Sequence, residues 1–345
     1  MAAPVVSVCI PTFNGAAFLD DCLRSVRSQS FSDFEIVIVD DNSTDETVAI
    51  AAQHAADDPR IQIFEYKTHS GLGGAGNYNR CIQHSHGEWI KYVFQDDLLA
   101  LRCLERMLEA TSAESRFVAC WKDFLFSPET PHQVRDEYLA MPDLKSVFGE
   151  HHRVDATTFC HAVLARWQKN FVGEPTSMLI HRDCFERYGQ FNPDIATFAD
   201  MECWIRIGSH EGLTIVPEVL ATFRIHKASM SGIIRHTRLY RAELERVLLC
   251  NNLAFSNQYA SLRAHAARVN PPIDPIQKLV QIAQDVRWLA IHAQNSQNDF
   301  TLLTEWENFS RHYPHITQLL PRTKEADPSL LTRIKKYIAR QIGPS

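Results

Sequence analysis

Two adjacent carboxylates at the end of an apolar stretch are the strongest chemical signal in this sequence. Asp96 and Asp97 directly follow the predicted strand Trp89–Phe94 and Gln95. Carboxylate oxygens suit Mg²⁺ or Mn²⁺, which proteins hold through one or two carboxylates together with phosphates of a substrate. Acidic pairs after strands also cap helices, so the pair by itself leaves a metal site and a cap as alternatives.

A second acidic turn, Asp40-Asp41-Asn42-Ser43, follows the apolar run Glu35–Val39. Such residues commonly form a turn and a helix N-cap, above all Asn42 and Ser43. The functional interpretation concerns Asp41, whose carboxylate can accept an N–H from the edge of a nucleobase. Both interpretations stay open at this point.

Two further candidates lie later in the chain. Asp200 is near the start of a predicted helix that is otherwise rich in apolar residues. An acid in a first helical turn is electrostatically favoured, but an acid on a buried helix can also serve as a general base. His226 follows Phe223-Arg224-Ile225 at a predicted strand end, where a lone histidine is either a structural group or a ligand.

A glycine-rich segment, Gly71–Gly76, matches the GxGxxG pattern, with Asp96 twenty residues beyond its last glycine. This pattern is typical of dinucleotide-binding folds when it follows a strand immediately. Here the predicted strand ends at Tyr66, and an earlier strand–helix–strand unit already ends in its own acidic turn. The glycines nevertheless permit close approach of the backbone to a phosphate.

These candidates need a scaffold, and the first third of the chain alternates apolar runs with helical patterns. The alternation predicts a mostly parallel sheet covered by helices on both faces, with ligands beyond the carboxyl ends of the strands. Residues 127–154 are polar, contain proline and are interpreted as a loop region, and the pattern from about residue 235 is wholly helical. The predicted strands of the first part are Val5–Ile10, Glu35–Val39, Ile61–Tyr66, Trp89–Phe94 and Phe117–Trp121.

Composition excludes several classes of protein. The 345 residues contain 45% hydrophobic and 22% charged residues, the balance of an ordinary globular chain. The net charge of −6 argues against nucleic-acid binding through bulk positive charge. Nine cysteines without a CxxC pair indicate reduced thiols, and the start lacks the basic region of a signal peptide, so we expect a cytoplasmic protein without a membrane span.

Together, the segments resemble the inverting glycosyltransferases of family two, which have the GT-A fold. The resemblance runs in the family's order over roughly residues 5–230, and no single segment would be specific without the others. It rests on VSVCIPTFNG from Val6, SVRSQSFSDFEIVIVDDNSTDET from Ser25, GNYNRCIQHSHGEWIKYVFQDDLL from Gly76, GEPTSMLIHRDCFERYGQF from Gly173, ADMECWIRI from Ala199 and VPEVLATFRIHKASMS from Val216.

The resemblance implies an α/β fold with a GT-A-type, Rossmann-like, mostly parallel sheet flanked by helices, and an all-helical C-terminal extension. It implies a glycosyltransferase domain over 1–234, with a nucleotide-sugar-binding half at 1–100 and an acceptor half at 101–234, followed by a helical region at 235–345. The glycine-rich segment then becomes a loop and helix start beside the nucleotide.

It also implies roles for individual residues. Asp200 matches the general base, and Asp97 and His226 match metal ligands for Mn²⁺ or Mg²⁺; His226 and Ser229 also match a segment that closes over the diphosphate. Many family members carry an arginine at the position of Tyr78, which leaves open whether Arg80 replaces it. The residues implied to bind the nucleotide are Pro11, Thr12, Phe13, Asp41, Gly71, Gln95 and Asp96.

The implied reaction is a single displacement that transfers a sugar from a nucleoside-diphosphate sugar to a saccharide or lipid-linked saccharide, as in surface polysaccharide synthesis. Asp41 can accept the ring N–H of uracil or thymine, which favours a uridine- or thymidine-diphosphate sugar over an adenine nucleotide; the resemblance favours uridine, and guanosine is the main alternative. Because Asp97 follows a strand, we expect it outside the core, so that Asp97→Asn removes metal-dependent donor binding without unfolding. Two other classes remain: a nucleotide-dependent oxidoreductase and an inactive sugar-nucleotide-binding scaffold.

The last predicted helix, residues 329–342, has apolar residues on one face and basic residues largely opposite. A basic amphipathic helix can lie in a membrane surface, or its apolar face can pack on the preceding helices. The sequence therefore leaves peripheral contact with the inner face of the membrane as an alternative to a simply cytoplasmic location.

Overall fold

A computed structural model describes residues 3–69, 74–167, 169–227, 229, 239–297 and 301–321 of the chain. Contacts between Cα atoms divide the chain into two compact units, Met1–Arg235 and His236–Ser345. Gly71 and the predicted amphipathic helix at 329–342 lie outside the described residues, so the expectations for both stay predictions.

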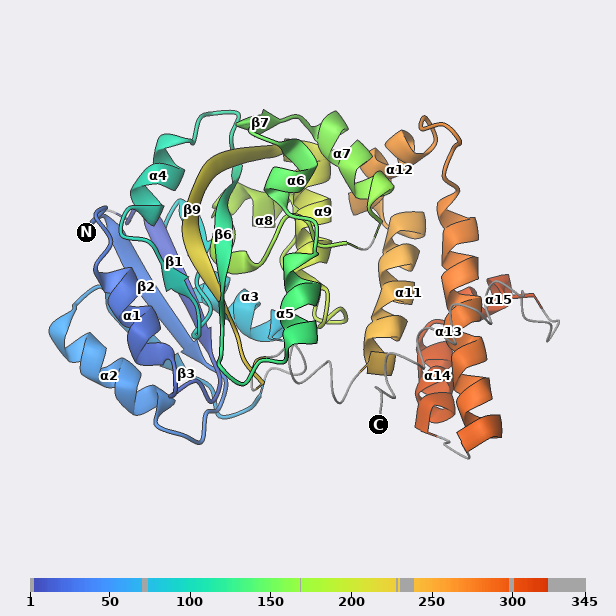
Figure 1. Ribbon diagram of the computed structural model, residues 1–345, viewed down its shortest axis with the longest axis horizontal. Helices are drawn as coiled ribbons and strands as arrows, with labels where there is room; N and C mark the ends of the chain where they lie inside the picture. Colours follow the sequence, from blue (N-terminus) through green and yellow to red (C-terminus); the bar gives the residue numbers. More distant parts are fainter. Residues whose placement is uncertain are drawn as a thin grey trace. The chain divides into compact units, whose positions relative to one another are not determined.

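Within the described part of the first unit, nine strands form one sheet in the order β3-β2-β1-β4-β8-β6-β9-β5, and β7 also pairs with β9 (Figure 1). The strands are β1 Val6–Thr12, β2 Phe34–Asp40, β3 Ile61–Glu65, β4 Trp89–Tyr92, β5 Leu98–Leu99, β6 Phe117–Phe126, β7 Arg153–Val154, β8 Met178–His181 and β9 Leu213–Ile225.

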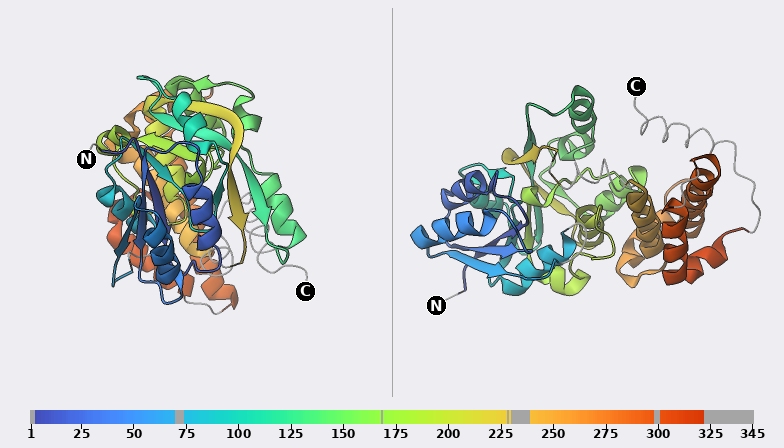
Figure 2. Two further views of the ribbon diagram at one scale, coloured as in Figure 1. Left: turned by 90° about the vertical axis from the view of Figure 1, so that its left-hand side faces the viewer. Right: turned by 90° about the horizontal axis from the view of Figure 1, so that it is seen from below.

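The half of the sheet formed by β3, β2, β1 and β4 is parallel throughout. Every residue of β1 and β2 is buried, because helices cover both faces of these strands. Helices α1 (Leu19–Arg27) and α2 (Thr47–Asp57) lie on one face, and α3 (Ala75–His84) packs on β1 and β2 from the other (Figures 1 and 2). Helix α1 buries Leu19, Cys22, Leu23 and Val26, the spacing of an amphipathic helix.

The other half of the sheet is mixed. Strand β8 is antiparallel to both β4 and β6, whereas β6 and β9 run parallel with two register shifts around Trp121. Helix α9 (Ala199–Glu211) contacts β6, α7 (Ala156–Ala165) and α8 (Arg182–Tyr188). The fold predicted from the resemblance, a mostly parallel sheet flanked by helices, is confirmed.

Two local predictions in this half are wrong. Strand β6 continues to Phe126, five residues beyond the predicted end, because its second half pairs with β9. The expected loop region at 127–154 contains two helices, α5 (His132–Leu139) and α6 (Leu144–Phe148). Helix α6 starts with a capping box between Asp143 and Ser146, and α5 buries Tyr138 against the aromatic side chains of β6 and β9.

The register of the parallel strands determines which ends meet. Thr12 at the end of β1 lies opposite Asp40 at the end of β2, and Cys9 lies opposite Tyr92 at the end of β4. Residues 93–97 therefore run past the last residues of β1. Three polar segments that are far apart in the chain thus come together at one edge of the sheet.

The described part of the second unit is helical, as predicted. Its helices are α11 Leu239–Phe255, α12 Ala260–Ala266, α13 Pro275–Gln297, α14 Thr301–His312 and α15 Pro314–Leu319. Helix α13 packs on α11 and α14. Helix α11 ends at Phe255, and Ser256 caps a short 3₁₀ turn before α12. No helix among the described residues of either unit is both long and apolar enough to cross a membrane.

Candidate active site

Phe13, directly after β1, is the exposed one of the three residues of this segment that were expected to bind the nucleotide. Its side chain is 40% exposed and its ring lies edge-on to His69, whereas Pro11 and Thr12 are buried. The Thr12 hydroxyl donates to Asp40 Oδ1 at 2.9 Å. Of the three residues expected to hold the nucleotide here, only Phe13 offers a side-chain surface to a ligand.

Gln95 was expected to contact the nucleotide, but its amide is used within the protein. Gln95 Oε1 accepts from Phe13 N at 2.9 Å, and Gln95 Nε2 donates to Phe13 O at 3.0 Å. The amide also fills the space beside Gly15, where a Cβ would collide with it. Gln95 therefore holds the backbone of Phe13 in place, and its amide is not free to bind the nucleotide.

Asp41 lies buried at the centre of a cluster of cationic and aromatic groups. Arg80 Nη1 donates to its Oδ1 at 2.7 Å, and His69 Nδ1 is 3.3 Å from its Oδ2. The Arg80 guanidinium stacks 3.9 Å above the ring of Tyr66, which follows β3. Arg80 thus contacts the expected base-binding carboxylate, which was not anticipated from the sequence.

The paired carboxylates after β4 differ sharply in environment. Asp97 is 0% exposed, contrary to the expectation that it lies outside the core. Its Oδ2 accepts from the Thr176 hydroxyl and its Oδ1 from Arg224 N at 2.9 Å. Burial and the neighbouring Asp96 charge raise the pKa of Asp97 well above its usual range. Both oxygens of the expected metal ligand are therefore engaged by protein donors.

Asp96 is the carboxylate that faces His226. His226 Nε2 and Asp96 Oδ2 lie 2.9 Å apart, and the two side chains are 10% and 14% exposed, respectively. Arg224 Nε donates to the Asp96 backbone oxygen at 2.9 Å, and Phe18 packs against the His226 ring. Ser229 donates its hydroxyl to His226 O at 2.8 Å, which closes the turn after β9.

These contacts favour Asp96 over Asp97 as the residue that binds a metal ion with His226. A carboxylate and an imidazole are suitable donors for Mn²⁺, and a substrate diphosphate supplies further oxygens in such sites. The described residues hold no group of three or more acidic, histidine or cysteine side chains arranged for a metal. The donor set fits an ion that binds together with a phosphorylated substrate.

Asp200 lies in the first turn of α9, half-buried, as the sequence predicted. Its Oδ1 accepts from Met201 N at 2.7 Å and its Oδ2 from Asn170 Nδ2 at 3.0 Å. Burial raises the pKa of Asp200 to about 7, against the opposing effect of the Met201 N–H. A carboxyl group with this pKa is suited to accept a proton near neutral pH.

Asn170, Thr176 and Arg224 position the acidic side chains and were missed by the sequence analysis. Asn170 is itself fixed by Gly173, whose N–H donates to Asn170 Oδ1 at 3.0 Å. Thr176 and Arg224 lie within segments that carried the resemblance, GEPTS and FRIH, so these segments were the available signal. Nothing in the sequence around Asn170 pointed to Asp200.

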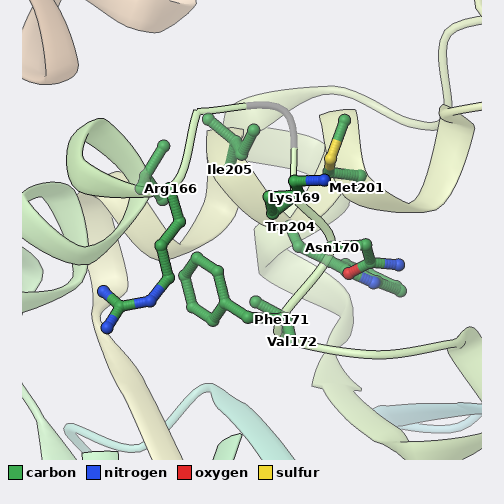
Figure 3. A pocket seen from close by; sticks show the side chains of 9 residues that line it. Arg166, Lys169, Asn170, Phe171, Val172, Met201, Trp204 and Ile205 are labelled. Atoms are coloured by element: carbon green, nitrogen blue, oxygen red, sulfur yellow. The ribbon is translucent and has the colours of Figure 1, made fainter. Parts of the chain in front are cut away.

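A small cavity lies between α7, α9 and the segment that contains Asn170 (Figure 3). Its volume of about 10 Å³ can hold one water molecule but no sugar. We therefore exclude it as the substrate site. Its lining includes the apolar side chains of Phe171, Met201 and Trp204, and Trp204 Nε1 donates to Gly173 O.

The end of the glycine-rich segment differs from a dinucleotide-binding turn. Strand β3 ends at Glu65 and α3 begins at Ala75, after Gly74 with φ 76°. The strand and the helix are thus separated by residues 66–74, whereas the fingerprint needs an immediate turn. The structure therefore gives no support to the oxidoreductase interpretation.

The model of the family described as "Glycosyl transferase family 2" matches residues 7–188, which is more than half of the chain. A putative teichuronic acid biosynthesis glycosyltransferase, TuaG of Bacillus subtilis, is 28% identical over 233 residues, covering 66% of this chain and 82% of that protein. The GalNAc(5)-diNAcBac-PP-undecaprenol beta-1,3-glucosyltransferase of Campylobacter jejuni is 33% identical over 106 residues, covering 31% of this chain and 34% of that protein.

Solved structures show the same fold. S. aureus TarS 1–349 in complex with UDP covers 97% of this chain and 88% of its own, with a TM-score of 0.56 and 16% identity. The mannosyltransferase PcManGT from Pyrobaculum calidifontis, in complex with GDP-Man and Mn²⁺, covers 90% of this chain and 85% of its own, with a TM-score of 0.51 and 17% identity.

The unequal environments of the two adjacent acids predict unequal effects on stability. Asp97→Ala leaves the Thr176 hydroxyl and the Arg224 N–H without an acceptor, and each buried unsatisfied donor costs about 1–3 kcal/mol. We expect the free energy of unfolding, measured by urea denaturation, to fall by about 2 kcal/mol or more. Asp96→Ala keeps the backbone oxygen that Arg224 binds and should cost about 1 kcal/mol or less. Equal losses in the two variants would contradict this division of roles.

Proposed function

Since the chain belongs to glycosyl transferase family 2, we propose that it transfers a sugar from a UDP-sugar to a saccharide hydroxyl by a single, inverting, metal-assisted displacement. The observation that carries the proposal is a set of three carboxylates with different environments: Asp41 and Asp96 follow β2 and β4 at one edge of the sheet, and Asp200 lies on α9, where its charge and that of Asp96 both act on Tyr78. Asp41 is paired with Arg80, Asp96 faces His226, and Asp200 has a pKa of about 7. These are the groups needed to bind a base, a diphosphate with its cation, and a reacting hydroxyl.

The contacts of Asp41 support uracil as the base. Uracil offers one ring N–H between two carbonyl oxygens, so it needs one acceptor and can use a neighbouring donor. Guanine presents a ring N–H beside an amino group and would use both oxygens of a carboxylate. Arg80 donates to Oδ1 and His69 lies 3.3 Å from Oδ2, so the carboxylate can add one ring N–H more easily than the two N–H groups of guanine, which favours uracil. The UDP complex of the similarly folded TarS is consistent with this choice.

Asp96 and His226 are proposed to hold Mn²⁺ or Mg²⁺ together with the diphosphate of the donor. When bound, the ion would offset negative charge on the leaving diphosphate. The similarly folded mannosyltransferase was solved with Mn²⁺, which supports a divalent ion without deciding which one. Phe13 would pack against the base, and Asp41 would accept a hydrogen bond from its polar edge. The buried side chain of Asp97 would hold the backbone so that Asp96 faces His226.

Asp200 is proposed to accept the proton of the attacking hydroxyl. Asn170 holds one oxygen of the carboxylate, and burial keeps its basicity high enough for proton removal. The hydroxyl attacks the anomeric carbon as the bond to the diphosphate breaks, so the configuration inverts and no covalent enzyme intermediate forms. The acceptor is proposed to be a saccharide of a surface polysaccharide, in view of TuaG, with a lipid-linked form by analogy with the Campylobacter relative.

The proposed lipid-linked acceptor suggests where the enzyme would work. A cytoplasmic enzyme could meet a lipid-linked saccharide at the inner face of the membrane, with residues 329–342 as the contact. These residues lie outside the described part of the chain, so the contact rests on their sequence pattern alone.

The pKa of Asp200 predicts the pH dependence of turnover. A base works only when ionised, and its raised pKa means that this form is lost as the pH falls through about 7. We therefore expect kcat for a UDP-sugar to fall about tenfold per pH unit below pH 6. Asp200→Asn should lower kcat by about 10²–10⁴-fold while the donor Kd stays unchanged. Asp194→Asn, at an exposed loop position, is the control. A kcat for Asp200→Asn within about threefold of wild type would refute the role.

The pairing of Arg80 with Asp41 predicts base selectivity. Calorimetry with Mn²⁺ should show UDP binding more tightly than GDP or ADP. Arg80→Ala removes the donor to Asp41 Oδ1 and should narrow the preference for UDP over GDP by about tenfold, the effect of one charged hydrogen bond. Arg102→Ala, which removes an exposed pair with Glu105, should leave the ratio unchanged. Tighter binding of GDP than UDP by the wild type would overturn the choice of base.

A further inference from the structure

Tyr78 on α3 packs against Phe94, two residues before Asp96, but has no part in the function described so far. Its ring is half-buried and held on several sides. It stacks on Phe94 with 5.3 Å between ring centroids and meets Phe191 edge-on at 5.3 Å. On a further side it rests against Gly74, where a Cβ would come within 2.8 Å of the Tyr78 hydroxyl. The ring therefore has little freedom to turn.

The elements around this ring are themselves fixed. Asn79 donates to Phe191 O at 2.8 Å and accepts from Phe191 N at 3.0 Å, so the segment after α8 is tied to α3. Asn77 Nδ2 donates to Val39 O at 2.9 Å and thereby ties the start of α3 to the end of β2. The position of the Tyr78 hydroxyl is thus determined by neighbours from three elements.

Whereas the ring is packed on several sides, the hydroxyl has no hydrogen-bond partner among the described residues. The hydroxyls of Tyr66, Tyr92 and Tyr188, by contrast, each have a partner. Burial and the charges of Asp200 and Asp96 raise the pKa of Tyr78 above its ordinary value, so the hydroxyl keeps its proton. It is a neutral donor within the influence of both acids.

The surroundings of the hydroxyl favour an anionic acceptor. It lies against Gly74, the N-cap residue of the ten-residue helix α3, and a glycine offers no side chain to cap that N-terminus. Helix N-termini favour negative groups through the helix dipole and their unpaired N–H groups. The ring stacks on Phe94, two residues before Asp96, so we place the phosphate of the sugar nucleotide between this N-terminus and an ion held by Asp96. An uncharged acceptor sugar would gain less from such a position.

We propose that the Tyr78 hydroxyl donates a hydrogen bond to the β-phosphate of the nucleotide sugar. This hydrogen bond becomes stronger as negative charge grows on the leaving phosphate. The inference rests on the proposed function, because it needs a nucleoside diphosphate in the site. As the bond between the anomeric carbon and the β-phosphate oxygen breaks, its electron pair stays on that oxygen. A fixed neutral donor stabilises this growing charge without changing its own protonation. Tyr78 would then touch the leaving group, unlike Asn170 and Gln95, which act through other residues.

Tyr78→Phe tests the proposal because it keeps the ring and removes only the hydroxyl. We expect kcat to fall by about 10-fold or more, the range for a hydrogen bond to a charged group. Calorimetry with Mg²⁺ should show UDP binding about tenfold more weakly, with the affinity for UMP, which lacks the β-phosphate, unchanged. The pH at which kcat falls should also stay unchanged, because a role through Asp200 would move it.

Tyr92→Phe is the matched control. Its hydroxyl belongs to the same aromatic cluster but donates to the backbone oxygen of Tyr78 at 2.7 Å. This variant should lose stability and keep the wild-type ratio of UDP to UMP affinity. If Tyr78→Phe keeps both kcat and that ratio, Tyr78 is a packing residue and the inference is wrong, although the proposed function stands. If the wild type binds neither UDP nor UMP, the proposed function itself fails.

Discussion

The buried carboxylate of Asp97 is the contact on which the arrangement of the site depends. It accepts hydrogen bonds from Thr176, which precedes β8, and from the backbone of Arg224 in β9. The same Thr176 hydroxyl accepts from Phe94 N at 3.1 Å, and buried Lys91 donates to its backbone oxygen. Two distant segments converge on this one acid, since an unsatisfied buried carboxylate would be costly. Its neighbour Asp96 is thereby held facing His226, two residues beyond Arg224.

The three acids of the site differ in their surroundings. Asp41 is paired with the guanidinium of Arg80, Asp96 faces the imidazole of His226, and burial raises the pKa of Asp200 to about 7. A nucleoside diphosphate adds further negative charge, whose repulsion at short range would oppose binding in a poorly solvated site. In the proposed function, a divalent ion and the N-terminus of α3 would both lower this cost.

A second buried network holds the loop that supports the aromatic cluster. Arg206 and Glu202 form an ion pair within α9 that is almost completely buried. Arg206 also donates to the backbone oxygens of Tyr188, Gly189 and Gln190, next to Phe191. Buried ion pairs add little net stability, because desolvation offsets their attraction. We infer that this pair chiefly positions the loop, and through Phe191 the ring of Tyr78.

The sequence by itself determined the parallel half of the sheet and the places where its polar residues fall. Continuous apolar runs require burial on both faces, and parallel strands bring their carboxyl ends to one edge. Tertiary structure alone decided what each polar residue does there. Asp97 is buried and Asp96 is available because of Thr176 and Arg224, which are 79 and 127 residues away from Asp97. The Gln95 side chain is hydrogen-bonded to the backbone of Phe13, 82 residues away in the sequence, and Arg80 pairs with Asp41, which is 39 residues away. Local patterns encode the period and the ends of an element, whereas the partner of a side chain depends on packing between distant segments.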